Sequence, residues 1–164
     1  MFVAAALFGD GAAAVVLRSV AAASERAAGA HHGRWRACLA QYRAHHGLGH
    51  FSVVLRPQLP VLMHQELRPA LEGFLQRHGL EREDFSGFLL HPGGRKILET
   101  AESVLGIDRA RLAHSWAVLR DYGNMSSVTA LFVLQRALRA QDRGAHLLAA
   151  FGPGFSAYFA ALEL

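Results

Sequence analysis

The amino-acid sequence predicts an α/β domain in which helices pack on the faces of a mixed β-sheet. Three observations lead to this fold class. Short apolar runs typical of strands alternate with segments of helical periodicity, and two apolar runs joined by Gly-Pro-Gly close the chain. Hydrophobic residues also make up 52% of the 164 residues, which is enough to bury a core. We find no internal boundary or repeat, and we expect a single domain over residues 1–164.

The N-terminal region begins with small apolar side chains. Residues 2–8 favour a helix end or a strand, the Gly-Asp-Gly at residues 9–11 predicts a tight turn, and residues 12–17 predict a buried strand. Residues 19–50 hold five of the ten histidines and show no sustained period. Residues 51–55 form a short run rich in β-branched and aromatic side chains, and we expect a strand there.

The region after residue 58 shows clear helical spacing. Apolar residues recur from Leu59 to Leu75 at the three- and four-residue intervals of one helix face. Pro69 lies inside this pattern and has no backbone N–H to continue a helix. The sequence therefore predicts two helices that meet at the proline, over residues 58–67 and 69–78.

The remaining elements alternate between strands and helices. Residues 85–90 predict a short apolar strand, and residues 95–105 place their apolar side chains on one helical face. Residues 127–140 predict a long apolar helix that is buried on most sides. Two strands, over residues 146–151 and 155–164, complete the sheet.

Charge and cysteine content limit the function classes. The formal net charge is +4 with a sequence pI near 10, but the basic residues are scattered, so we expect no nucleic-acid partner. The apolar start lacks a basic lead-in and is interrupted by residues 9–11, which argues against a signal peptide or membrane span and favours a cytoplasmic protein. The single cysteine, Cys38, excludes an internal disulfide and suits a buried core position. The paired histidines lack the spacing of metal ligands, so we expect no metal site.

His91 is the first candidate for chemistry. It follows an apolar strand directly and precedes Pro-Gly-Gly and a helix. Open α/β folds bind ligands at the carboxyl ends of strands, and glycines before a helix N-terminus let an anionic group approach the backbone. The alternative is a histidine that only completes a turn, and the tetrapeptide alone favours that alternative.

Asn124 has a similar setting, after a Tyr-Gly turn and before two serines that open a helix. Its side chain could donate to a substrate carbonyl, and with His91 it would supply two neutral donors to an enolate oxygen. The structural alternative is a turn in which Asn adopts an unusual backbone conformation and Ser126 or Ser127 caps the helix. The Gly-Pro-Gly at residues 152–154 alone predicts only a plain turn.

Five segments, in this order, resemble the C-terminal half of type III polyketide synthases, the chalcone/stilbene-synthase-like enzymes of the thiolase superfamily. The segments are LFGDGAAAVV (7–16), FSVVL (51–55), HPGG (91–94), YGNMSS (122–127) and FGPGF (151–155). The resemblance covers most of residues 1–18 and 51–164, whereas residues 19–50 match poorly. It implies one thiolase-like half, with a mixed sheet and helices packed on its faces.

The resemblance also implies a mechanism and a set of site residues. Such enzymes use a Cys-His-Asn triad, in which His and Asn bind the thioester carbonyl of malonyl-CoA and stabilise the enolate left by decarboxylation. His91 and Asn124 match the His and Asn, and CoA thioesters would be substrates without a further cofactor. The positions that match pocket or tunnel residues are Phe51, Gly93, Gly94, Lys96, Ser126, Gly152, Pro153 and Gly154.

The nucleophilic cysteine of the family lies before the Gly-Asp-Gly segment, in an N-terminal half. Cys38 lies after that segment, so by position it is not the nucleophile. We therefore expect an N-terminal catalytic domain to be absent from this chain. The partners implied are malonyl-CoA, an acyl-CoA starter, the missing half and, in the complete enzyme, a second copy forming a homodimer. The alternative is a truncated, non-catalytic dimerisation or binding module of the thiolase fold.

Overall fold

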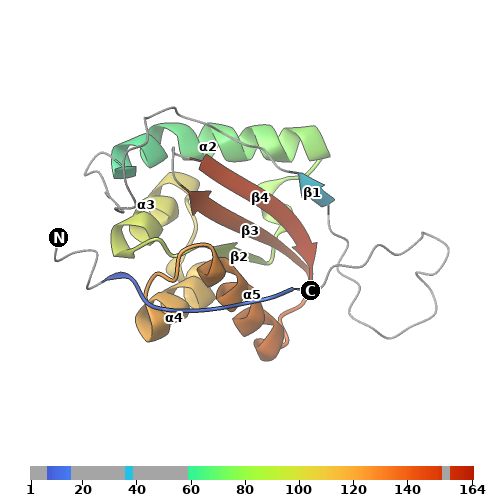
Figure 1. Ribbon diagram of the computed structural model, residues 1–164. Coiled ribbons are helices and arrows are strands. Elements are labelled where there is room, and N and C mark those ends of the chain that lie inside the picture. The colour runs from blue at the N-terminus through green and yellow to red at the C-terminus, as the bar shows by residue number, and fades with distance from the viewer. Residues whose placement is uncertain (1–6, 16–35, 39–58, 153–155) are drawn as a thin grey trace, which may run out of the picture.

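The fold is a four-stranded sheet with helices on both faces (Figure 1). The computed structural model describes residues 7–15, 36–38, 59–152 and 156–164. In chain order the helices and strands of the described residues are β1 (Arg36–Cys38), α2 (Leu59–His78), the 3₁₀ helix η2 (Arg82–Asp84), β2 (Gly87–Leu90), α3 (Arg95–Leu105), the 3₁₀ helix η3 (Arg109–Leu112), α4 (Ala113–Tyr122), α5 (Val128–Ala140), β3 (Ala145–Gly152) and β4 (Ser156–Glu163).

The sheet is mixed, as the sequence predicts. Its strand order is β1-β4-β3-β2, in which β2 pairs with β3 in parallel and β4 pairs antiparallel with both β3 and β1. Phe88 of β2 lies opposite Leu147 of β3, and Leu147 lies opposite Ala161 of β4. The parallel pair needs a crossover, which α3, α4 and α5 supply.

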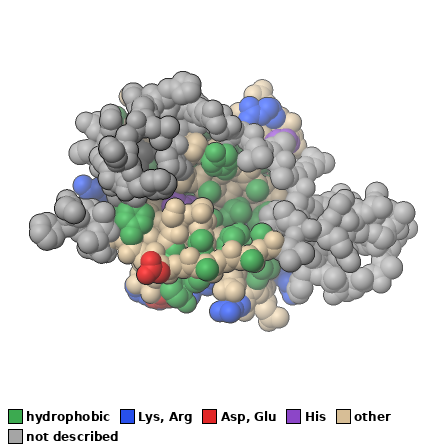
Figure 2. Space-filling model, in the orientation of Figure 1, with side chains coloured by type: hydrophobic (Ala, Val, Ile, Leu, Met, Phe, Trp, Pro, Cys, Tyr) green, Lys and Arg blue, Asp and Glu red, His purple; other side chains and the backbone are tan. Residues whose placement is uncertain are grey.

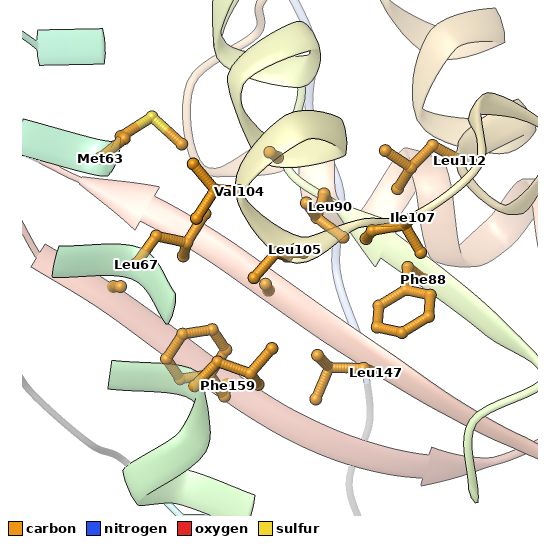
Figure 3. Close-up of a cluster of buried hydrophobic side chains, with 14 of the residues drawn as sticks. Met63, Leu67, Phe88, Leu90, Val104, Leu105, Ile107, Leu112, Leu147 and Phe159 are labelled. Atoms are coloured by element: carbon orange, nitrogen blue, oxygen red, sulfur yellow. The ribbon is translucent and has the colours of Figure 1, made fainter. Parts of the chain in front are cut away.

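Alternating side chains divide the core between the two faces of the sheet. Phe88 and Leu90 point to the face covered by α2 and α3, whereas Leu89, between them, packs with α5. The larger core lies on the α2 and α3 side, where Met63, Leu67, Val104, Leu147 and Phe159 meet (Figure 3). The domain is therefore a three-layer α/β/α arrangement with the sheet in the middle.

Most predicted elements after residue 80 are confirmed. Helix α3 has the predicted bounds, α5 begins one residue later than predicted, and the two closing strands form an antiparallel pair. Strand β2 begins at Gly87, two residues after the predicted start, because Phe85 is buried outside the ladder. Helix α4 has no counterpart in the prediction.

Pro69 does not divide the helix, so the predicted pair of helices is wrong. Helix α2 continues through the proline over 20 residues. Pro69 faces solvent, while Met63, Leu67 and Leu71 on the other side are buried. A proline removes one backbone hydrogen bond and strains the preceding turn, and burial of a continuous apolar face outweighs that cost here.

Two further predictions need correction. Residues 9–15 form neither a turn nor a strand, and residues 10–15 are exposed; a run of alanines gains little from burial and has a low strand propensity. Helix α5 is not buried on most sides, because Gln135, Leu138 and the residues after it face solvent. The predicted strand at residues 51–55 and the paired histidines lie outside the described residues.

Figure 2 shows hydrophobic side chains in the centre of the visible face, among other side chains and backbone. The large hydrophobic side chains that are exposed among the described residues are Val15, Val61, Tyr122 and Leu138. Within the same residues, no helix combines the length and hydropathy that a membrane span requires.

Candidate active site

His91 lies at the carboxyl end of β2, as the sequence predicts. Its backbone N–H donates to the carbonyl of Ala149 at 2.7 Å, which extends the pairing of β2 with β3 to this residue. Its own carbonyl accepts from the N–H of Gly93 at 3.0 Å, so the chain turns at once toward α3. The parallel ladder and this turn together fix the backbone from which the imidazole projects.

The imidazole of His91 is buried and incompletely hydrogen-bonded. The residue is 6% exposed, and its Nδ1 atom has no hydrogen-bond partner among the described residues. Burial lowers the pKa of His91 to about 4, because the charged form loses its hydration. The side chain is therefore a neutral imidazole at pH 7, able to donate one N–H.

The backbone of Asn124 is held by hydrogen bonds to residues 7–9 of the N-terminal segment. This contact was not predicted from the sequence. Its N–H donates to the carbonyl of Leu7 at 2.8 Å and its carbonyl accepts from Gly9 at 3.1 Å. Two glycines make this close approach possible. A Cβ on Gly9 would lie 2.2 Å from the carbonyl oxygen of Tyr122, and one on Gly123, at φ +71°, would lie 2.7 Å from that of Leu7.

The side chain of Asn124 joins the two motifs of the site. Its Nδ2 donates to the carbonyl of Gly93 at 3.0 Å, and its Oδ1 accepts from the N–H of Ser126 at 2.8 Å. One end of the amide faces an acceptor and the other a donor, so these partners fix which end is oxygen. The amide group has two N–H bonds, and the Gly93 carbonyl engages one of them.

The structure therefore places Asn124 in direct contact with the turn that follows His91. Gly93 and Ser126, both predicted as substrate-binding positions, supply the contacts. The imidazole and the amide are both uncharged N–H donors, and both lie close to Gly93, just before the N-terminus of α3. Such a pair can stabilise an oxygen that becomes negative during a reaction, without an ionised side chain.

The other predicted positions are distributed around this centre or lie outside the described residues. Gly94 is buried at the N-terminus of α3, and Lys96 is exposed in its first turn. Gly152 ends β3. Phe51, Pro153 and Gly154 lie outside the described residues. Cys38 lies in β1 and pairs with Phe159.

Two buried hydroxyls at this centre were not predicted. Ser115 of α4 accepts the N–H of Leu90, the residue before His91, at 3.0 Å. Thr129 of α5 accepts the N–H of Met125, the residue after Asn124, at 2.8 Å. Ser127 is the N-cap residue of α5, as predicted, but its side chain makes no capping hydrogen bond. In the sequence, Ser115 and Thr129 could have been recognised as polar side chains on the apolar faces of α4 and α5.

Two hollows on the described surface lie away from His91 and Asn124. One, of about 310 Å³, lies between α2, η2 and the end of α3. The other, of about 100 Å³, lies beside Asp142, which contacts the Nε2 atoms of His114 at 2.8 Å and His146 at 3.5 Å. Within the residues that the structure describes, no group of three or more His, Cys, Asp or Glu is arranged to hold a metal ion.

Comparison with known proteins shows which family the chain is similar to. A model of the family described as chalcone and stilbene synthases, C-terminal domain, matches residues 46–159. The crystal structure of PKS-I from the brown alga Ectocarpus siliculosus is similar to the chain with a TM-score of 0.61 and 34% identity. The similarity covers 67% of this chain and 31% of that one.

Two curated relatives also match most of this chain but only part of their own length. The 1,3,6,8-tetrahydroxynaphthalene synthase of Streptomyces peucetius subsp. caesius is 39% identical over 176 residues, which is 98% of this chain and 45% of that protein. A putative chalcone synthase of Bacillus subtilis (strain 168) is 36% identical over 111 residues, 65% of this chain and 30% of that protein. The chain thus spans less than half the length of these relatives.

Proposed function

The chain belongs to the chalcone and stilbene synthase C-terminal domain family, within the type III polyketide synthases and their thiolase-like fold, and from this premise we propose that it supplies the oxyanion-binding half of a decarboxylating, carbon–carbon bond-forming acyltransferase. Residues 1–164 act as one such C-terminal domain. His91 and Asn124 are the catalytic residues, and the nucleophilic cysteine comes from a segment outside this sequence.

In the proposed reaction, His91 and Asn124 each donate an N–H to the thioester carbonyl oxygen of malonyl-CoA. The bond between the α-carbon and the carboxylate breaks, CO₂ leaves, and the electron pair moves into an enolate whose oxygen carries the charge. The two donors stabilise that oxygen more strongly than the neutral carbonyl. The enolate carbon then attacks an acyl group held as a thioester on the cysteine, and the thiolate leaves as the new carbon–carbon bond forms.

The observation that carries this proposal is the contact between the two motifs. The Asn124 amide donates to Gly93, two residues after a histidine whose Nδ1 is buried without a partner among the described residues. Burial also lowers the pKa of that histidine to about 4. A neutral imidazole suits this task, because it donates a hydrogen bond without bringing a positive charge that would trap the carboxylate of the substrate.

The test measures malonyl-CoA decarboxylation as release of CO₂ and formation of acetyl-CoA. The chain is assayed alone and mixed with the part of the Streptomyces peucetius relative that it does not match. We expect no condensation product from the chain alone, and condensation with an acyl-CoA starter only in the mixture. Removal of one oxyanion donor by His91→Ala or Asn124→Ala should lower the decarboxylation rate by roughly 10²- to 10³-fold.

A matched histidine serves as the control. His64 is exposed on α2, so His64→Ala should leave the rate unchanged. Polyketide formation by the chain alone would contradict the assignment of the nucleophile to another segment. An unchanged decarboxylation rate in His91→Ala would contradict the donor role. A folded chain that neither decarboxylates nor restores condensation in the mixture would favour the non-catalytic module.

A further inference from the structure

The turn that carries Asn124 is held by a buried threonine at the start of α5. Thr129 is 0% exposed. Its hydroxyl oxygen accepts the N–H of Met125 at 2.8 Å, and its hydroxyl hydrogen is donated to the carbonyl of Ser126 at 2.7 Å. The backbone N–H of Thr129 donates to the same carbonyl at 3.1 Å. The threonine thus binds both residues that follow Asn124.

The conformation held in this way is an unfavourable one. Ser126 has a φ of +60°, and it is one of two residues other than glycine with positive φ in the described part of the chain. A side chain disfavours this left-handed region, so it persists where the surroundings enforce it. Thr129 holds the chain on both sides of this torsion, because its hydroxyl oxygen accepts from the N–H of Met125 and its hydroxyl hydrogen is donated to the carbonyl of Ser126.

The turn that Thr129 holds also contacts the side chain of Asn124. The N–H of Ser126, which lies between the Met125 N–H and the Ser126 carbonyl bound by Thr129, donates to Oδ1 of Asn124 at 2.8 Å. The terminal torsion of an asparagine has a broad energy minimum and needs such partners to be fixed. With Oδ1 held, Nδ2 is directed at the Gly93 carbonyl, 3.0 Å away. A connected series of hydrogen bonds therefore leads from Thr129 to the turn after His91.

We propose that Thr129 is a positioning residue for Asn124, whose hydroxyl sets the orientation of the Asn124 amide without touching the substrate. The significance of this orientation for catalysis rests on the proposed function, whereas the orientation itself is measurable without any reaction.

The experiment compares Thr129→Val with Thr129→Ser in the full chain. Valine has nearly the shape of threonine and lacks the hydroxyl, whereas serine keeps it. In each ¹⁵N-labelled protein, NMR follows the side-chain amide of Asn124 and hydrogen exchange at the N–H of Met125. In the valine variant we expect exchange at Met125 to rise by about fivefold, the ratio for one hydrogen bond of ordinary net strength. The two Asn124 side-chain N–H resonances should also move toward those of a freely rotating amide.

The serine variant should resemble the unaltered chain in both measurements, and amides of β3 should report equal folding in all three proteins. Unchanged Asn124 resonances in a folded valine variant would overturn the positioning role. If the valine variant does not fold, the unaltered chain still provides a test, since exchange at Met125 as fast as in an open turn would show that the hydroxyl does not hold it. Loss of decarboxylation in Asn124→Ala, with full activity in Thr129→Val, would refute the positioning role alone.

Discussion

Replacing His91 by glutamine should remove a defined part of the pH dependence of stability. Burial lowers the pKa of His91 from 6.5 to about 4 in the folded chain. Between these values the unfolded chain binds more protons than the folded chain, so the His91 contribution makes stability fall as the pH falls. The linkage relation gives a loss of about 2 kcal/mol between pH 7 and pH 5 from this one group.

The assay is urea unfolding followed by circular dichroism at pH 7 and pH 5. The unaltered chain should lose about 2 kcal/mol more unfolding free energy than His91→Gln over this interval, because glutamine has similar size and does not titrate. The difference between the two proteins cancels the contributions of the other histidines. An equal pH dependence in both would refute the reasoning, as would an NMR titration of the His91 ring with a midpoint near 6.5.

Two substitutions elsewhere test how the backbone of the site is held. Gly123→Ala should lower the unfolding free energy by more than about 2 kcal/mol, since it adds a collision with Leu7 to a positive φ; Gly79→Ala, at φ +59° with open space around its Cβ, should lose only about 1 kcal/mol. Similar losses in thermal unfolding would show that the contact with residues 7–9 does not form. Ser115→Ala should lower the unfolding free energy by about 1–3 kcal/mol in denaturant, because it leaves the buried N–H of Leu90 without its acceptor. Ser103→Ala, at an exposed position of α3, should stay within about 0.5 kcal/mol of the unaltered chain, and an equal effect of both would contradict the account.

The sequence predicted the elements whose local pattern agrees with their tertiary setting. Helix α3 alternates buried and exposed positions strongly and ends at Gly106 in the left-handed conformation, and both of these features are visible as residue types. Strand β2 is apolar and ends at Leu90, directly before His91 and the Pro-Gly-Gly. Sequence periodicity could therefore place His91 at the end of a strand.

The wrong predictions concern segments whose secondary structure depends on contacts with residues far away in the sequence. Whether Pro69 ends a helix depends on the apolar surface available beyond it, which local sequence does not report. Whether residues 12–15 form a strand depends on a neighbouring strand with free hydrogen-bonding groups. A stretch of about ten residues reports neither the apolar surface on which a helix will pack nor the strand with which a segment will pair.

The contact between the two motifs was also not predictable from their sequences. Asn124 and Gly93 are 31 residues apart. The local sequence predicts that each motif precedes a helix, but it does not predict that the two motifs touch. Their meeting follows from the parallel pairing of β2 with β3, which requires a crossover that brings α4 back across the sheet. The resemblance to a family implied that both residues act together, but it gave no physical reason for their proximity.

That physical reason lies in the Gly93 carbonyl. A backbone carbonyl directly after a strand and before a helix belongs to neither ladder and needs a donor. Asn124 supplies that donor and is itself held by Ser126, so the hydrogen-bonding requirement of one turn orients the side chain of the other. A substitution that changed only the direction of the Gly93 carbonyl would therefore disturb Asn124 before it disturbed His91. Gly93 thus connects the HPGG turn to Asn124 through its carbonyl, as well as to His91 through its N–H.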